Sequence, residues 1–245
     1  LSVFLRRKSI VILSLRYVSK KAETYGTIVR TGSPTICRQG MASLASALLN
    51  IQASVYGDAA VAAVTISNKI YLLVRNVIIG IGQGFQPVAG YNYGARNLKR
   101  VRESVSFSVK IGTVFCVCMA VLLYFQAGTV IAWFRRDDPD VIRIGTLALR
   151  FACGVMPFMA YSTYVNQMFQ CLGFSTPAML LACCRQGFCF VPLIFVLPAL
   201  FGLMGVQMAQ PGADLLTFLI SVPCQISFYR NHLQLSGTGQ SGGGT

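Results

Sequence analysis

Long apolar stretches separated by short polar or charged segments run through most of the chain. As helices, six of these stretches are long enough to cross a hydrocarbon core of about 30 Å. They lie near residues 27–51, 59–83, 105–126, 142–168, 177–200 and 203–228. The breaks carry turn or charge signals, for example "YGD" from Tyr56 and "RRDDPD" from Arg135. Because the stretches are long and do not alternate polar with apolar residues, a membrane β-barrel is excluded. The pattern predicts an all-α integral membrane protein with six transmembrane helices.

The composition supports a chain whose solvent is partly lipid. Hydrophobic residues make up 54% of the chain and charged residues 11%, and the mean hydropathy is +0.61. A soluble domain carries about a quarter charged residues. The net charge of +14 is not spread over a soluble face, as a nucleic-acid-binding surface requires, because the cations cluster between the apolar runs. The bilayer is therefore the expected partner, and nucleic acid is not.

The distribution of cations predicts how the chain is oriented. Cations gather in the first 26 residues, in the segment after the second apolar run and at Arg230, whereas the opposite loops hold Arg135 and Arg136 beside three aspartates. The positive-inside rule then places both termini in the cytoplasm of a cell carrying the protein in its plasma or inner membrane. Residues 1–26 are interpreted as an amphipathic cytoplasmic connection, residues 27–230 as the membrane domain and residues 231–245 as a disordered cytoplasmic tail.

Polar side chains recur at helical spacing inside several of the predicted spans. Because a polar side chain facing lipid is costly, such stripes indicate a bundle around a polar interior that substrate or ions could cross. Hydrogen-bonded contacts between helices are the alternative explanation. The candidate pathway residues are Arg38, Gln39, Asn50, Asn68, Lys69, Arg75, Asn166, Gln167, Arg185, Gln207, Gln210 and Asp214.

Asp214 is the one carboxylate well inside a predicted span, since the other six acidic residues lie near the ends of spans or in loops. One interpretation is a group that takes up and releases a proton, because burial favours the neutral form of a carboxyl group. The other is a permanent ion pair with Arg38, Lys69, Arg75 or Arg185. The sequence leaves both open.

Enzyme chemistry has no support in the sequence. His232 is the only histidine, so a Ser-His-Asp or Cys-His arrangement has no base within the predicted spans. The nine cysteines show no C-x-x-C spacing, and most are expected to be buried as small hydrophobic residues. We therefore expect no catalytic residues, no metal site and no cofactor.

One segment, "GIGQGFQPVAGYNYGARNLKRVRE" from Gly80 to Glu103, closely resembles the link between the second and third helices of the C-terminal lobe in multidrug and toxic compound extrusion (MATE) transporters. Further segments resemble that lobe in the same order: "GSPTICRQGMASLASALLN" from Gly32, "YGDAAVAAVTISNKI" from Tyr56, "CRQGFCFVPLIFVLP" from Cys184 and "QPGAD" from Gln210. The resemblance covers most of residues 27–228.

This resemblance implies one six-helix lobe of a twelve-helix MATE-type transporter. The family implies a secondary antiporter that exports cationic, amphipathic compounds by alternating access in exchange for H⁺ or Na⁺. Its partners would be the first lobe or a second copy of this chain. Two alternatives stay open: a lipid-linked saccharide flippase of the same superfamily, or a membrane fragment that transports nothing.

The link segment is expected to form a bent helix end leading to a cytoplasmic loop. Gly80, Gly82 and Gly84 would allow close helix approach, and Pro87 would disrupt the regular helix. Backbone groups freed in this way would bond to amide side chains, namely Gln83, Gln86 and Asn92. Such a bend is a candidate flexing point for alternating access, and a passive structural turn is the alternative.

Overall fold

The computed structural model describes residues 22–136 and 138–230. The predicted connection over residues 1–26 therefore lies mostly outside the described residues, and the predicted tail lies entirely outside them. All the regular structure described is helical. The helices are α2 (Ala22–Ser54), α3 (Asp58–Gly94), α4 (Leu98–Phe134), α5 (Pro139–Cys171), α6 (Ser175–Cys183), η2 (Cys184–Phe188), α7 (Phe190–Phe201) and α8 (Leu203–Phe228).

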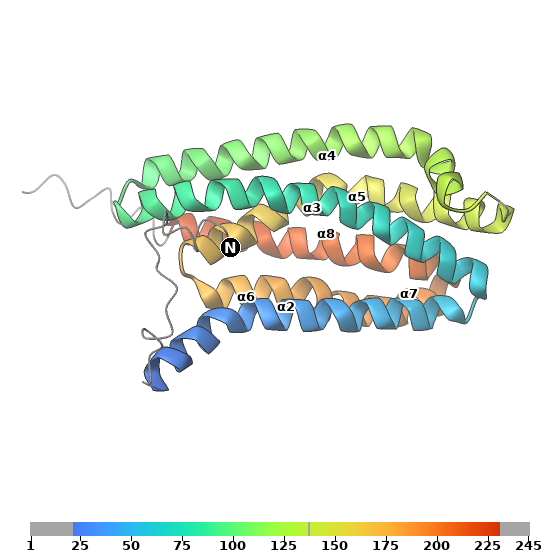
Figure 1. The fold of residues 1–245 in the computed structure, drawn as a ribbon, viewed down its shortest axis with the longest axis horizontal. Helices are drawn as coiled ribbons and strands as arrows, with labels where there is room; N and C mark the ends of the chain where they lie inside the picture. Colours follow the sequence, from blue (N-terminus) through green and yellow to red (C-terminus); the bar gives the residue numbers. More distant parts are fainter. Residues whose placement is uncertain (1–21, 137, 231–245) are drawn as a thin grey trace, which may run out of the picture.

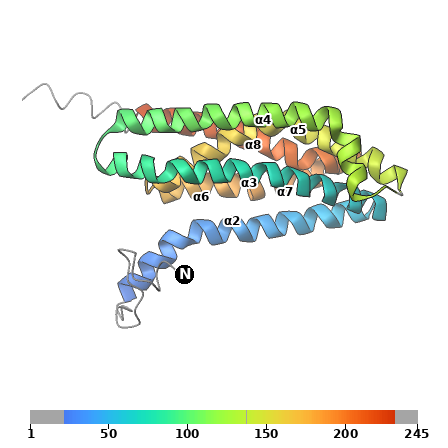
Figure 2. The ribbon, with the colours of Figure 1, turned by 45° about the horizontal axis from the view of Figure 1, so that its top comes forward.

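The helices form an antiparallel bundle in which α6, η2 and α7 follow one another as a single rod (Figure 1). One side of the bundle consists of α3, α4 and α5, while α2 lies along α6 and α7 on the other side. The α8 helix packs between the two sides, against both α5 and α7. Figure 2 shows that the first turns of α2 diverge from the bundle.

Two groups of buried apolar side chains hold the bundle together. The larger lies among α3, α4 and α5 and includes Ile78, Met156 and Tyr164. The smaller joins α2 to α7 and α8 through residues such as Leu49 and Phe190. Polar side chains of α3, η2 and α8 occupy the region between these groups, which is where the candidate site lies.

Five of the described helical segments are long and apolar enough to cross a membrane: α3, α4, α5, the rod over Thr176–Phe201, and α8. The α2 helix has 33 residues but is not among these five, because glycine, threonine, serine and glutamine interrupt its apolar residues. The α4 helix has 37 residues, or about 55 Å at 1.5 Å per residue, so its ends extend beyond a hydrocarbon core of about 30 Å.

The second predicted span belongs to a helix that is longer than expected. A bent helix end was expected near Pro87, whereas α3 continues through Pro87 as far as Gly94. The reason is tertiary packing: Phe85 meets the ring of Tyr164 on α5 with centroids 6.2 Å apart, and Ala89 is fully buried. The connection to α4 is then short, and Asn97 caps α4 by accepting a hydrogen bond from the backbone N–H of Arg100.

The fifth predicted span is interrupted by a π-helical turn, η2. Within this turn Cys184, Arg185, Gln186 and Gly187 are all buried. Single π-turns inside α-helices are frequently found at functional sites. Here the turn places Arg185 on the inner side of the bundle.

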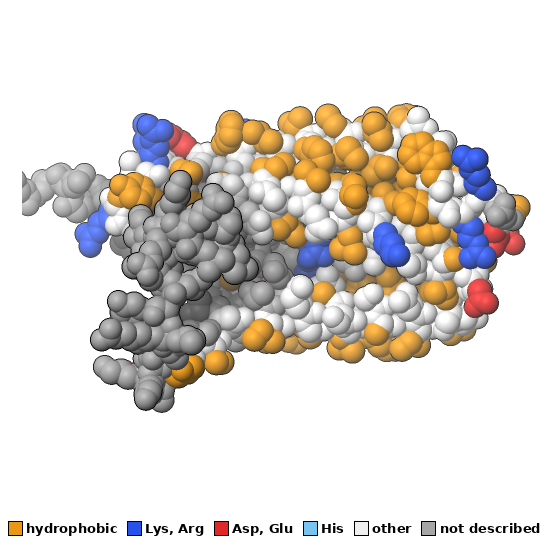
Figure 3. Space-filling view, in the orientation of Figure 1, with side chains coloured by type: hydrophobic (Ala, Val, Ile, Leu, Met, Phe, Trp, Pro, Cys, Tyr) orange, Lys and Arg blue, Asp and Glu red, His pale blue; other side chains and the backbone are white. Residues whose placement is uncertain are grey.

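Charged side chains are concentrated at the two ends of the bundle, and a few cations lie between them on the surface seen in Figure 3. The α3–α4 end carries Arg96, Lys99, Arg100 and Arg102, and the opposite end carries Arg135, Arg136, Asp138 and Asp140. The described chain begins and ends at the α3–α4 end of the bundle (Figure 1). A chain that starts and finishes at the same end of a bundle crosses it an even number of times.

Candidate functional site

The centre of the bundle contains a buried ion pair between α8 and the π-helical turn. Arg185 Nε lies 2.6 Å from Asp214 Oδ1, and the Tyr71 hydroxyl on α3 donates a hydrogen bond to Asp214 Oδ2. Asp214 is fully buried and Arg185 is 8% exposed. The Asp214 carboxylate therefore connects three helical elements that are distant in sequence. Of the two roles that the sequence left open for Asp214, this geometry favours the permanent ion pair.

The local sequence explains why these groups face inward. On α8, Gln207, Asp214, Thr217, Ser221 and Gln225 are all buried at spacings of three, four and seven residues. Thr217 bonds its own helix by donating to the Ala213 carbonyl at 2.7 Å. A stripe at this spacing lies on one face of a helix, and that face of α8 is turned toward α3 and α5.

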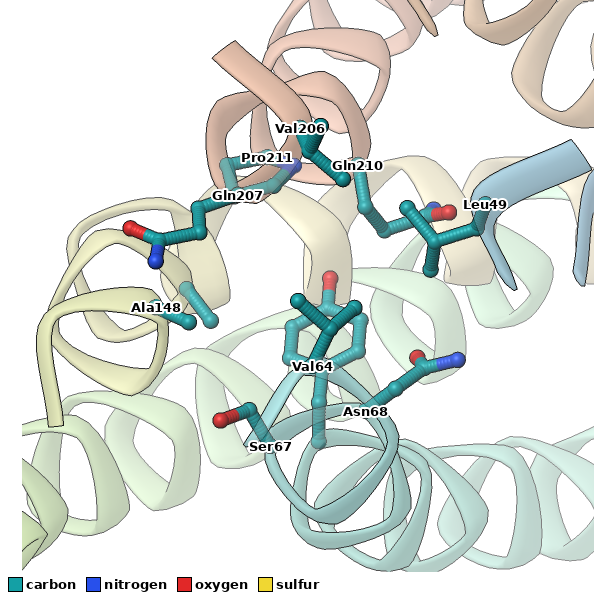
Figure 4. A pocket seen from close by; sticks show the side chains of 11 residues that line it. Leu49, Val64, Ser67, Asn68, Ala148, Val206, Gln207, Gln210 and Pro211 are labelled. Carbon is teal, nitrogen blue, oxygen red and sulfur yellow. The ribbon is translucent and has the colours of Figure 1, made fainter. Parts of the chain in front are cut away.

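A first cavity lies between α3 and α8 and leaves about 40 Å³ for water-sized molecules. Figure 4 shows Gln207 and Gln210 of α8 on one side of it and Val64, Ser67 and Asn68 of α3 on the other. Gln207 donates to the Ile144 carbonyl at 3.3 Å. A cavity of this size holds water but no amphipathic drug.

A second cavity of about 40 Å³ lies beside Arg185 of the ion pair. Arg75 and Arg185 both line it, together with Asn166, Gln167 and Thr217. Asn166 donates to the Ala178 carbonyl at 2.8 Å, and Gln167 donates to the Ile79 carbonyl at 3.3 Å. These two predicted pathway residues therefore also connect helices.

A third cavity of about 110 Å³ opens beside α2. Asn68, Tyr71, Arg75, Gln186 and Gln210 line it. The structure thus brings together most of the predicted residues of α3, α5, η2 and α8 around Tyr71 and Asp214, in three small cavities rather than in one open channel.

Several predicted residues do not join this cluster. Lys69 is exposed and lines an apolar groove between α3 and α4. Gln39 and Asn50 of α2 are exposed, and the side chain of Arg38 lies outside the described part of the structure. The stripe of α3 at residues 69, 76 and 83 is exposed along its length. The inward stripe of α3 is Ser67, Tyr71 and Ile78.

The glycine-rich motif plays the predicted packing role at one position only. A Cβ at Gly82 would lie 1.6 Å from Gln167 Oε1, so Gly82 permits α3 to approach α5. For Gly80 and Gly84 the expectation is wrong, because a Cβ at either position meets no atom within 4 Å. Gln83 is exposed and Gln86 is half-buried. Asn92 donates to the Val88 carbonyl at 2.8 Å, within its own helix.

Tyr71 is the central residue that the sequence interpretation missed. Its signal was available, because Ser67, Asn68, Tyr71 and Arg75 follow the spacing of one helical face. Tyrosine fits an apolar pattern through its ring, but its hydroxyl is the group that reaches Asp214.

Among the described residues, no group of three His, Cys, Asp or Glu side chains is placed to hold a metal ion. The nine cysteines are free thiols. The small cavities are lined by guanidinium, amide and hydroxyl groups.

Comparison with known proteins gives the family. The MatE family model matches residues 34–196. The chain is 25% identical over 205 residues to the multidrug export protein MepA of Staphylococcus saprophyticus and 26% identical over 205 residues to that of Staphylococcus aureus. Both matches cover 83% of this chain and 44% of the relative. The chain thus spans about half the length of the curated relatives it matches.

Solved structures share the fold. A transporter of Pyrococcus furiosus, whose structure is described as showing reverse polarity of its binding pocket, matches with a TM-score of 0.82 and 22% identity. The alignment covers 94% of this chain and 52% of that one. A mutant of the Vibrio cholerae MATE transporter VcmN matches with a TM-score of 0.82 and 16% identity, covering 95% of this chain and 52% of that one. One lobe of these transporters therefore corresponds to the bundle seen in Figure 1.

The family match, the helical bundle of membrane-spanning length and the half-length correspondence agree with one another. The chain belongs to the MatE family of membrane transporters.

Proposed function

We propose that the chain forms the second lobe of a secondary antiporter that exports cationic, amphipathic compounds in exchange for H⁺ or Na⁺. The observation that supports this most strongly is the match of the MatE family model over residues 34–196. The relatives named multidrug export proteins support the choice of substrate class. Alternating access would then occur between this lobe and a first lobe, or between two copies of this chain.

The proposed orientation puts the α3–α4 end of the bundle in the cytoplasm. This end carries four cations and the single acid Glu103 within a few residues of the turn. The opposite end combines its cations with Asp58, Asp138 and Asp140. The positive-inside rule favours the cytoplasm for the more basic end, and both termini would follow it there.

Asp214 is not proposed as the residue that binds the coupling ion. Both carboxylate oxygens already have partners, Arg185 and Tyr71. Proton or Na⁺ binding at Asp214 would require the ion pair to open during the transport cycle. The groups that carry the coupling ion are therefore proposed to lie at least partly in the other lobe.

The test begins with the intact mass of the native product, since a mass near 26.6 kDa identifies a half-transporter and one near twice that value a two-lobe chain. Membrane vesicles containing the native product are then loaded with ethidium, and its movement is followed under an imposed H⁺ or Na⁺ gradient. Gradient-driven ethidium transport supports the proposal. A native product that moves no cationic dye under either gradient contradicts it.

The second candidate is a flippase for lipid-linked saccharides. Arg75 and Arg185 line one cavity in the lobe, and an anionic headgroup would favour such a lining. Transfer of a fluorescent anionic glycolipid between leaflets, without ethidium transport, would support this candidate over the antiporter.

A further inference from the structure

A wide apolar groove runs along the outer side of the bundle between α3 and α4. It leaves about 710 Å³ open, compared with about 40, 40 and 110 Å³ for the three central cavities. Sites for small molecules commonly measure about 300–1,000 Å³. The groove therefore has room for an organic molecule that the central cavities exclude.

The lining of this groove is mostly apolar and uncovered. Nine of its twelve lining residues are apolar, among them Leu73, Leu122 and Trp133. These three side chains are 65%, 54% and 70% exposed, and Figure 3 shows apolar side chains gathered over α4 on the face that it presents. An apolar ligand that covered them would be held by the hydrophobic effect. A lipid chain meets this requirement as well, so the charge of the groove decides between ligands.

Lys69 is the one charged residue in the described lining of the groove, and no acidic side chain lines it. The Lys69 side chain is exposed and forms no ion pair or hydrogen bond with another described residue. An ammonium group beside an apolar surface favours an anionic partner, because the hydrogen bonds between them are charge-assisted. The groove therefore matches an amphipathic anion and disfavours a cation.

The depth of Lys69 favours a ligand with a compact head group. Lys69 lies eleven residues, or about 16 Å, along α3 from Asp58. Trp133 lies near that same end of the bundle, at the end of α4, and tryptophan is enriched at membrane interfaces. The phosphate of a bilayer phospholipid stays at the interface, above the level of Lys69. A carboxylate on one alkyl chain can enter the groove and balance a charge that is costly inside the apolar region.

We propose that the groove between α3 and α4 binds an amphipathic carboxylate with one alkyl chain, such as a medium-chain fatty acid. The carboxylate pairs with the ammonium group of Lys69, and the alkyl chain lies along Leu122 and Trp133. These two residues are about 16 Å apart along α4, which sets the length of chain that fits. The site goes beyond the proposed export of cationic compounds, since binding here does not require the chain to pump.

Trp133 provides the readout, because it is the single tryptophan of the sequence and lines the groove. The purified full chain is placed in phosphatidylcholine nanodiscs at about pH 9, so that the ligand carboxylate stays ionised although burial favours its neutral form. Quenching of Trp133 fluorescence is measured during titration with 11-bromoundecanoate, because bromine quenches tryptophan at short range. The neutral 11-bromoundecanol and the cationic (11-bromoundecyl)trimethylammonium are titrated in parallel. The half-quenching concentration of the carboxylate should be at least about tenfold lower than that of the alcohol.

Lys69→Gln is the decisive variant, because it removes the ammonium group and leaves the apolar lining in place. It is expected to abolish the preference for the carboxylate, while quenching by the alcohol stays unchanged and shows that the groove is intact. Lys110→Gln is the matched control. Lys110 is also an exposed lysine, twelve residues along α4 from Leu98, but it lies toward the other end of the bundle and outside the groove. The preference should be unchanged in this control.

A carboxylate preference that disappears in Lys69→Gln and persists in Lys110→Gln supports the site. The proposal is overturned if the three amphiphiles quench alike, or if the two variants respond alike, which indicates attraction to the overall positive charge. It is also overturned if none of the amphiphiles quenches Trp133. Dibrominated phosphatidylcholine then shows the reason: quenching by this lipid means that the bilayer fills the groove, and no quenching means that another lobe or a second copy covers it.

Discussion

Asp214 shows what a carboxylate requires in the interior of a membrane bundle. It accepts one hydrogen bond from a guanidinium and one from a phenol, and none of its surface is exposed. Both donors come from other helical elements. The side chain therefore also fixes the positions of α3, η2 and α8 relative to one another.

Removing one member of this pair should be costly. Asp214→Asn leaves Arg185 buried beside a neutral amide, and we expect the free energy of unfolding to fall by about 3–5 kcal/mol. Combining it with Arg185→Gln should cost clearly less than the sum of the two single changes. Denaturant unfolding of the four proteins in detergent checks this. Additive losses would show that the two side chains do not act as a pair.

Tyr71→Phe measures the contribution of the Tyr71 hydroxyl alone. The ring is 5% exposed and stays packed, so only the hydrogen bond to Asp214 is lost. A hydrogen bond to a charged group is worth about 1.5–3 kcal/mol, and we expect a loss of unfolding free energy in that range. Tyr124→Phe, on the exposed face of α4, should change it little and serves as the control. Equal losses of unfolding free energy in the two variants would show that the hydrogen bond from Tyr71 to Asp214 does not stabilise the fold.

At the scale of the helices, close approach is concentrated at a few glycines. A Cβ at Gly205 would lie 2.1 Å from the carbonyl oxygen of Leu197, so α8 begins directly against the backbone of α7. A Cβ at Gly187 would lie 2.0 Å from Met41 Cε, the far end of a flexible side chain. The two positions look equally crowded, but only Gly205 faces atoms that have no freedom to move aside.

Alanine substitution should affect stability differently at these two glycines. Gly205→Ala forces α7 and α8 apart and is expected to lower the free energy of unfolding by about 1–3 kcal/mol or more. Gly187→Ala should change it by less than about 1 kcal/mol, because Met41 adopts another rotamer. Thermal unfolding of both variants measures the difference. A larger loss for Gly187→Ala would contradict the packing of the α7–α8 turn described above.

The extension of α3 is a further effect at this scale. The sequence around Pro87 predicted a helix end, since proline removes one backbone hydrogen bond. The packing of Gly82, Phe85 and Ala89 against α5 outweighs that loss. The turn moves to Ala95–Asn97, where Arg96 adopts a positive φ of 57°.

At the scale of the whole molecule, the two ends of the bundle differ in charge although the middle is mainly apolar (Figure 3). Close to the α3–α4 end, Arg102 lies over the ring of Tyr229, 5.9 Å from its centroid. Burial raises the pKa of the Tyr229 hydroxyl above its ordinary value. This contact joins the start of α4 to the end of α8, so the basic end is packed and not merely a loose loop.

The proposed topology is testable with introduced cysteines. In a variant whose exposed Cys37 and Cys118 are replaced by serine, Arg96→Cys should react with an impermeant maleimide only when the cytoplasmic side is accessible. Asp138→Cys, at the opposite end, should react in intact cells. Labelling of both positions from one side would refute the antiparallel arrangement across the membrane. Labelling with the sides exchanged would refute the positive-inside orientation.

The sequence by itself determined the class of protein, the family and the positions of three of the turns. Apolar length identifies membrane helices, and the short breaks at Tyr56, Arg135 and Gly173 carry signals that do not depend on the partner helices. The MATE resemblance rested on the segment from Gly80 to Glu103, and the family match agrees with it.

Only the tertiary structure decided which polar side chains meet. Helical spacing fixes which residues share a face, but in a lipid-exposed bundle the outside is as apolar as the inside, so the pattern does not tell which face turns inward. Lys69 and Arg75 were therefore grouped together, although one faces an outer groove and the other the central cavities. The pattern likewise does not identify Tyr71 as a partner of Asp214, and it leaves Arg185 as one of four possible partners. Both contacts depend on how α3 and η2 are rotated relative to α8.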